Sequence, residues 1–446
     1  MLLLYFLVLI SLLAIKNSKF KTLLMIYKLL KNTYLFLLIS MVSCGSSPGQ
    51  NEITVKNSNS EIPPSAISVK KPSPIIVGAN RIETYLPLLK DKKVGIVGNQ
   101  SSLIFKSRKS ESETIKYTHL VDSLLARKIQ VTRVFAPEHG FRGTADAGEV
   151  VKDGKDSKTG LPIISLYGDN KKPKPEQIND LDLIIFDLQD VGARFYTYIS
   201  SLHYVMEACA QNNIPLLILD RPNPNGHYVD GPILDPEYHS FVGMHPVPVV
   251  HGLTMGEYAK MINGEKWLKN GVQVDLQVIK IKNYDHQKPY SLPIKPSPNL
   301  PNDQAINLYP SLCFFEGTNV NAGRGTEYQF QVFGSPFLDK TFYKYSYTPQ
   351  SKDGAKNPKH LGEICFGKDL TKTSHLNNIE LNWLIEAYEN TSNKSKFFNA
   401  FFTKLAGGPE LQKQIESGMT SEEIKKTWQK GLESFKVKRE TYLLYQ

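Results

Sequence analysis

The sequence predicts an α/β protein with a mostly parallel, doubly wound sheet, followed by a second, smaller α/β domain. Between residues 75 and 240, short apolar runs alternate with segments of helical spacing, which is typical of parallel strands joined by helices. The runs at 181–190 and 214–224 are apolar almost throughout, as expected for strands covered on both faces. Polar side chains follow several of these runs, where sheets of this kind bind their ligands.

The individual elements can be assigned in chain order. Strands are predicted at residues 92–100, 131–140, 161–168, 181–190 and 214–224, and helices at 112–128 and 196–213. After residue 240 the alternation weakens, and residues 241–446 are assigned to the smaller, auxiliary domain. This part should contain a helix at 254–268, with a capping box formed by Thr254 and Glu257, and a strand at 274–281.

Residues 1–44 are predicted to form an export leader. Lysines precede an apolar run from Tyr34 to Val42, which is followed by the small residue Ser43, as in signal peptides. The next residue, Cys44, stands where a bacterial lipoprotein box has its lipidated cysteine. Residues 1–24 contain a second apolar stretch, so the alternative is a two-span membrane anchor, but neither stretch reaches the roughly 20 clean apolar residues that a span needs. We therefore expect an exported lipoprotein of the periplasm or cell envelope, translated from Met25.

The net charge of +10 does not indicate a nucleic-acid-binding protein. Residues 1–43 contain five lysines and no acidic residue, so they supply half of the excess. No basic stripe with interleaved aromatic residues follows. Residues 45–74, rich in Ser, Asn, Pro and Lys, are predicted to be a flexible tether between the leader and the folded domain at 75–240.

No metal or cofactor is predicted. Cys209, Cys313 and Cys365 show no CxxC spacing, so they are interpreted as small buried residues. The chain has no HExxH, GxGxxG or P-loop motif.

The stretch VFAPEHGFRG places Glu138, His139 and Arg142 directly after an apolar strand. A carboxyl group in a poorly solvated cleft can hold a proton near neutral pH and act as a general acid. The alternatives are a surface ion pair between Glu138 and Arg142 and a purely structural role for His139, which could otherwise orient Glu138 or bind substrate.

The stretch DLQDVGARFYTY ends the next buried strand. Carboxylates and amides beside an arginine and tyrosines suit the recognition of sugar hydroxyls and ring faces. The candidate residues are Asp187, Gln189, Asp190, Arg194 and Tyr198. The alternative is that Asp190 caps the following helix and that the tyrosines belong to the core.

Three further segments supply candidate binding residues. In LDRPNPNG, Asp220 and Arg221 are expected to pair and hold a proline-stiffened loop that carries Asn223. His251 is a scattered histidine that could join the site. The glycine-containing stretch EGTNVNAGRG can present polar side chains to a ligand, namely Glu316, Asn319 and Arg324.

These motifs together resemble the bacterial exo-β-N-acetylmuramidases, glycoside hydrolase family 171, formerly a domain of unknown function. The resemblance rests on APEHGFRGTADAGE, TGLPIISLYG, FDLQDVGARFYTYIS, LDRPNPNG, HGLTMGE, PSPNLP and FFEGTNVNAGRGT, in this order. It implies a Rossmann-like catalytic domain and the release of terminal β-linked N-acetylmuramic acid from the non-reducing end of peptidoglycan fragments. It also implies that Glu138 is the catalytic glutamate. Asn321, where the family often has Ser, and Tyr228-Val229 are local departures.

For the mechanism, Glu138 is expected to donate the proton, and Asp190 is the first choice for the second catalytic role. Asp187, Glu316 and the substrate's own acetamido oxygen are the alternatives for that role. Arg142, Arg194 or Arg324 is expected to bind the lactyl carboxylate of the substrate. The competing functional hypothesis is a non-catalytic, glycan-binding surface lipoprotein.

Overall fold

The computed structural model describes residues 73–106, 116–142 and 153–446. The predicted leader, the lipidation site Cys44 and nearly all of the predicted tether lie outside these ranges. Within them, no helix combines the length and apolar character needed to cross a membrane.

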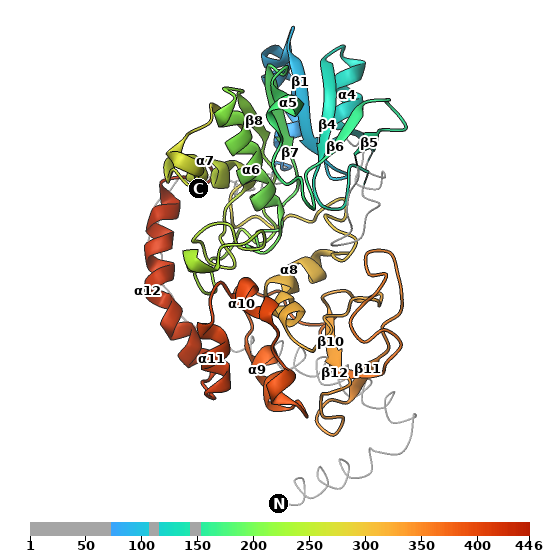
Figure 1. The fold of residues 1–446 in the computed structure, drawn as a ribbon, viewed down its shortest axis with the longest axis vertical. Helices are drawn as coiled ribbons and strands as arrows, with labels where there is room; N and C mark the ends of the chain where they lie inside the picture. Colours follow the sequence, from blue (N-terminus) through green and yellow to red (C-terminus); the bar gives the residue numbers. More distant parts are fainter. Residues whose placement is uncertain (1–72, 107–115, 143–152) are drawn as a thin grey trace, which may run out of the picture. The chain divides into compact units, whose positions relative to one another are not determined.

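The larger sheet has seven strands in the spatial order β5-β6-β4-β1-β7-β8-β9 (Figure 1). Its strands are β1 Lys93–Gly98, β4 Gln130–Ala136, β5 Gly154–Lys155, β6 Pro162–Ser165, β7 Leu183–Asp187, β8 Leu216–Leu219 and β9 Leu276–Ile279. All neighbours pair in parallel except β5, which is antiparallel to β6 at one edge. The parallel strands run 3-2-1-4-5-6 in order of appearance, which is the Rossmann arrangement.

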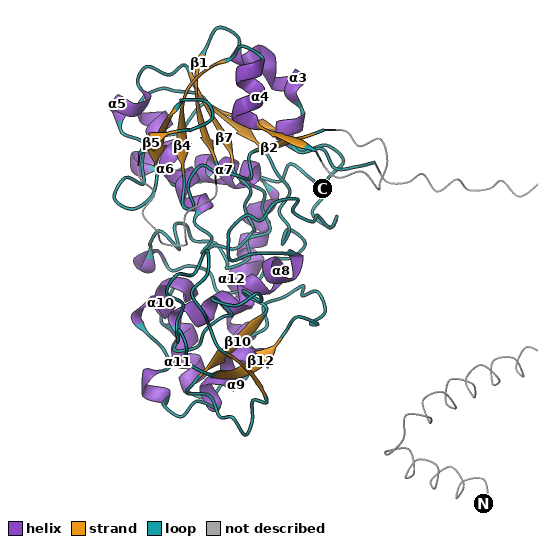
Figure 2. Ribbon diagram, turned by 90° about the vertical axis from the view of Figure 1, so that its right-hand side faces the viewer, coloured by secondary structure: helices purple, strands orange, loops and turns teal. Residues whose placement is uncertain are grey.

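Helices cover both faces of this sheet because successive strand residues point to opposite sides. Ile184 and Phe186 pack into the core on the side of α5 Pro175–Ile178, α6 Tyr198–Gln211 and α7 Met255–Gly264. Ile185, between them, packs on the other side with α3 Ile82–Tyr85 and α4 Leu120–Ala126. Figure 2 shows α3 and α4 on one side of the sheet and α5 and α6 on the other. The predicted fold class is thereby confirmed.

The remaining elements build the second, smaller part. It contains the antiparallel sheet β10-β12-β11. Its strands and helices are α8 Asp303–Leu312, β10 Val332–Ser335, β11 Tyr345–Tyr347, β12 Cys365–Asp369, α9 Asn382–Glu389, α10 Ala400–Ala406, α11 Glu410–Glu416 and α12 Ser421–Glu440. Because β9 pairs with β8, the large sheet includes residues beyond position 240.

Short elements complete the fold. A two-stranded sheet pairs β2 Leu103–Phe105 with β3 Tyr117–His119. The 3-10 helices are η1 Gly78–Asn80, η2 Leu86–Leu89, η3 Pro236–Tyr238, η4 Lys269–Gly271, η5 Cys313–Gly317 and η6 Lys394–Lys396.

Most predicted elements are confirmed, with one correction. The capping box of α7 forms as expected, with Thr254 Oγ1 accepting from the Glu257 amide. Of the helix expected at 112–128, residues 112–115 lie outside the described ranges, and residues 117–119 form strand β3 instead. α4 therefore begins at Leu120, where His119 Nδ1 accepts a hydrogen bond from the amide of Val121.

Candidate active site

Polar residues from several strands meet at one edge of the large sheet, as predicted. Asn99 follows β1, Glu138 follows β4, and Asp187 and Asp220 stand at the ends of β7 and β8. Parallel strands bring their carboxyl ends to the same edge. The sequence therefore located the right edge, but the roles of these side chains differ.

A cavity of about 910 Å³ lies at this edge. The sheet side contributes Glu138, His139, Tyr167 and Thr197, and the smaller part contributes residues from Ser297 to Leu405. Among the described lining residues, Glu138 and Glu316 are the only carboxylates. The cavity therefore combines one acid from each part of the molecule.

Glu138 is half-buried in the cavity wall. Its Oε2 accepts a hydrogen bond of 2.8 Å from Thr197 Oγ1, at the N-terminus of α6. The phenol of Tyr167 also interacts with Glu138: burial, followed by the charge of Glu138, raises the tyrosine's pKa to about 12. The carboxyl group is thus held in a defined position by two hydroxyl-bearing side chains that both line the cavity.

His139 and Gly140 form the turn that carries Glu138 out of the strand. Both have left-handed backbone conformations, with φ of 72° and 73°. This region is uncommon for residues other than glycine. His139 is buried and lines the cavity, so it is placed for either of its two predicted roles.

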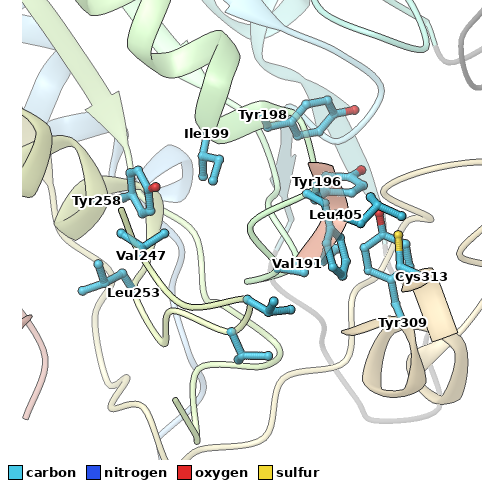
Figure 3. Packing of buried hydrophobic residues seen from close by; sticks show 14 of the residues in the cluster. Val191, Tyr196, Tyr198, Ile199, Val247, Leu253, Tyr258, Tyr309, Cys313 and Leu405 are labelled. Atoms are coloured by element: carbon cyan, nitrogen blue, oxygen red, sulfur yellow. The ribbon is translucent and has the colours of Figure 1, made fainter. Parts of the chain in front are cut away.

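Tyrosines form the floor of the cavity. Figure 3 shows Tyr196 close to Tyr309, Cys313 and Leu405. Tyr196 donates to the carbonyl of Pro296 at 2.9 Å, and the hydroxyl of Tyr198 accepts from Asn99 Nδ2 at 2.6 Å. Burial raises the pKa of Tyr198 above the ordinary value for tyrosine. Tyr198 is therefore both a core residue and a lining residue.

The predicted pair of Asp220 with Arg221 is wrong as stated, because the partner of Arg221 is Asp187. Arg221 Nε and Nη2 donate to the two Asp187 oxygens at 2.6 and 3.0 Å, and both residues are buried. Asp220 instead accepts from the hydroxyls of Thr254 and Tyr445. Asp187 therefore forms a structural ion pair and is not among the described residues that line the cavity.

Asp190 is fully buried beneath the lining residues. Its Oδ2 accepts from the amide of Gly192 at 2.6 Å and lies 3.8 Å from His251 Nε2. Burial raises the pKa of Asp190 to about 7 and lowers that of His251 to about 3. Since neither residue lines the described cavity wall, this placement does not support a direct contact with substrate.

Gln189 and Asn223 also serve the scaffold. Gln189 Nε2 donates to the carbonyls of Asp190 and Pro222, and Asn223 Nδ2 donates to that of Leu253. Both side chains are buried and hold the strand-end loops together. Neither is among the described residues that line the cavity.

Arg194 is wrongly predicted as a substrate clamp. It is fully buried, with Nη1 donating to the carbonyls of Pro232 and Val247 and Nη2 to that of Leu405, at 2.7 to 2.9 Å. Burial lowers its pKa to about 9. The guanidinium group therefore joins the loops of the larger part to α10.

Arg142 is also engaged within the protein. Its Nε and Nη2 donate to both oxygens of Asp156, at 3.1 and 2.7 Å, and its guanidinium carbon lies 4.5 Å from the Phe141 ring centre. Since Arg142 does not appear among the described lining residues, it is a poor candidate for a clamp.

Arg324 and Glu316 do line the cavity. They belong to the smaller part of the chain, whereas Glu138 belongs to the larger part. Arg324 Nε lies 3.0 Å from Glu316 Oε1, and both side chains are about one quarter exposed. Asn319 is not among the described lining residues; its carbonyl accepts from His360 Nε2 instead.

Lys359 was not predicted from the sequence. Its Nζ donates to the carbonyls of Phe315, Thr318 and Val320, and thus holds the glycine-containing stretch that carries Glu316. No signal in the sequence marks this lysine. Tyr167, two residues beyond β6, could have been found by the same strand-end rule as Glu138.

Within the described ranges, no three His, Cys, Asp or Glu side chains group to hold a metal ion. Cys209, Cys313 and Cys365 are buried free thiols, as interpreted from their spacing.

The fold and the cavity define a two-part α/β enzyme with a positioned acid at the carboxyl end of a parallel strand. Comparison with known proteins identifies the family. Residues 94–304 match the family model "Exo-beta-N-acetylmuramidase NamZ, N-terminal", and residues 307–445 match the corresponding C-terminal model. The chain belongs to the NamZ exo-β-N-acetylmuramidase family of glycoside hydrolases.

Individual relatives agree with this assignment. The peptidoglycan β-N-acetylmuramidase NamZ of Bacillus subtilis (strain 168) is 37% identical over 395 residues, covering 82% of this chain and 90% of the relative. A DUF1343 family crystal structure from Bacteroides fragilis NCTC 9343 is 46% identical, with a TM-score of 0.75, and covers 84% of this chain and 99% of its own. A second one from the same organism is 27% identical, with a TM-score of 0.68, and covers 83% and 99%.

The buried guanidinium group provides a test of how the two parts are held together. We expect Arg194→Met to lower the free energy of unfolding by about 2–4 kcal/mol, because three buried carbonyls lose their donor. Urea denaturation followed by tryptophan fluorescence measures this. The control is Lys413→Met, which removes an exposed ion pair with Glu410 and should cost no more than about 1 kcal/mol. Equal losses in the two variants would contradict the joining role of Arg194.

Proposed function

We propose that this chain releases terminal β-linked N-acetylmuramic acid from the non-reducing end of peptidoglycan fragments. The observation that carries the proposal is the position of Glu138, a half-buried carboxyl group in the wall of a large polar and aromatic cavity. The family assignment indicates which sugar is released, and the geometry identifies a residue that can act on its glycosidic bond.

In this reaction Glu138 gives its proton to the glycosidic oxygen as the bond from that oxygen to the anomeric carbon breaks. Thr197 and Tyr167 hold the carboxyl group toward the cavity. Where the second group is a nucleophile, Glu138 then takes a proton from the water that completes the hydrolysis; where it is a general base, that group takes the proton. For the second role, Glu316 replaces Asp190 as our candidate, because it is the other carboxylate on the described wall. The substrate's acetamido oxygen is the alternative to an enzyme carboxylate.

The role of Glu138 is tested by Glu138→Gln, which keeps the size of the side chain but cannot donate an acidic proton. We expect kcat/KM on a disaccharide of N-acetylmuramic acid β-linked to N-acetylglucosamine to fall by about 10²–10⁴-fold. The fall should be smaller on a para-nitrophenyl muraminide, because nitrophenolate leaves without protonation. The measurement is steady-state kinetics on both substrates.

Two results would count against this role. Unchanged turnover of the disaccharide by the variant would remove Glu138 from the mechanism. Binding of the disaccharide by the wild-type protein without any release of sugar would favour a non-catalytic glycan-binding protein.

We further propose that Arg324 binds the lactyl carboxylate that distinguishes N-acetylmuramic acid from N-acetylglucosamine. Arg194 and Arg142 are occupied by carbonyls and by Asp156, respectively, whereas Arg324 lines the cavity. A guanidinium group can bind a carboxylate with two parallel hydrogen bonds, which an ammonium group cannot reproduce. Its Nε donates to Glu316 Oε1, and we assign the Nη edge of the guanidinium group to the lactyl carboxylate.

This role predicts a loss of selectivity in Arg324→Lys. We expect kcat/KM on a chromogenic muraminide to fall by about 10- to 100-fold, and that on the matching glucosaminide by less than about threefold. Arg142→Lys, outside the described cavity wall, serves as the control. Equal losses on both substrates would refute the carboxylate contact.

The lipoprotein-like leader supports the proposal that the enzyme is exported and anchored to a membrane through lipidated Cys44. In a bacterial host, we expect Cys44→Ser to abolish labelling with radioactive palmitate and to move the protein out of the membrane fraction. The wild-type chain, expressed in parallel, is the reference. A wild-type protein that carries no label would overturn the lipid anchor.

A further inference from the structure

The cavity is large for a small-molecule site. Its volume of about 910 Å³ lies near the upper end of the roughly 300–1,000 Å³ typical of small-molecule sites. The exposure of its lining residues ranges from buried to exposed. Tyr196, Tyr309 and Phe330 are nearly inaccessible, whereas Asn357 and Phe401 are exposed although they line the same cavity. The cavity therefore has a closed floor and an open rim.

Phe401 is the exposed aromatic residue of this rim, with 38% of its surface accessible. It lies in the first turn of α10, where its amide donates to Asn399 Oδ1. Its chain neighbour Phe402 packs in the core against Phe398 and Phe314. In α10, Phe401 therefore faces the cavity and Phe402 packs in the core. Because Phe402 is held there, the backbone that carries Phe401 is fixed.

Asn357 adds polar atoms to the same rim. It belongs to the segment from Gly354 to Lys359, all of which lines the cavity. This segment is held at both ends, by the bond from Asn299 Nδ2 to the carbonyl of Gly354 and by the carbonyl contacts of Lys359. An exposed amide side chain on a fixed loop can donate to and accept from sugar hydroxyls.

Phe241 brings a second aromatic ring to the cavity on the side of Glu138. Its carbonyl accepts from Ser200 Oγ at 2.7 Å, one turn into the helix that begins beside Thr197. Its ring centre lies 6.2 Å from that of Tyr167, which contacts Glu138. Two aromatic rings, those of Tyr167 and Phe241, therefore line the cavity beside the acid.

We propose that Phe401 and Asn357, with Phe241 on the side of the acid, form a subsite for the sugar on the leaving side of the scissile bond. The apolar face of that sugar packs on Phe401, and its hydroxyls bond to Asn357. The terminal muramic acid occupies the closed floor, while the rest of the glycan lies along the open rim. This subsite rests on the proposed function, because it assigns the rim to the second unit of that substrate.

The test compares two substrates that differ only on the leaving side. One is the disaccharide used above, and the other is methyl β-N-acetylmuraminide, which places no sugar in the subsite. For Phe401→Ala we expect kcat/KM on the disaccharide to fall by about 5- to 20-fold, the scale of one lost ring contact. The fall on the methyl glycoside should be less than about twofold. Asn357→Ala should show the same selective loss. Phe401→Tyr, which keeps an aromatic ring, should retain most of the wild-type kcat/KM on the disaccharide.

The matched control is Phe342→Ala, an exposed phenylalanine that does not line the described cavity and should leave both rates unchanged. Equal losses on the two substrates in Phe401→Ala, or no loss on either, would overturn the subsite. If the wild-type protein cleaves neither substrate, the proposed hydrolysis fails. Calorimetric binding of the disaccharide then decides the subsite separately: Phe401→Ala must weaken binding while Phe342→Ala does not.

Discussion

Arg194 is a buried contact that helps to join the two parts of the chain around the cavity. Arg194 follows β7 by a few residues, and its donors reach the carbonyls of Pro232 and Val247 in the larger part and of Leu405 in α10. A positive charge without a carboxylate partner is stable in the interior only when carbonyl dipoles surround it. Leu405 itself lines the cavity, so the contact that joins the parts also sets the position of one wall.

Few polar residues at the sheet edge face the cavity, because most of them make contacts inside the protein. The ion pair of Asp187 with Arg221 and the buried carboxyl groups of Asp190 and Asp220 hold strand-end loops in place. Polar side chains buried at this density must find partners, or the loops would be unstable. Glu138, carried outward by the turn at His139 and Gly140, is the acid that this scaffold presents.

The sequence was sufficient for the fold and for one end of the site. The near-continuous apolar runs predicted the parallel strands, and the strand-end rule found Glu138. The sequence did not distinguish Asp187 and Asp190 from Glu138. All three lie at the ends of buried strands, and only tertiary packing decides which side chain is buried and which lines the cavity. The sequence also missed Lys359, whose three carbonyl partners lie about forty residues earlier in the chain. A partnership of that kind depends on tertiary contact and leaves no local pattern.

Both parts of the chain contribute residues to the cavity wall, and this has a thermodynamic consequence. A ligand that touches both the sheet edge and the glycine-containing stretch binds the native chain and has no comparable site in the unfolded one. By mass action, its occupancy then adds to the stability of the whole molecule, by about 2.7 kcal/mol at a ligand concentration one hundred times Kd. The enzyme would thus be most resistant to heat and proteolysis while cell-wall fragments are abundant, and easiest to degrade once they are consumed.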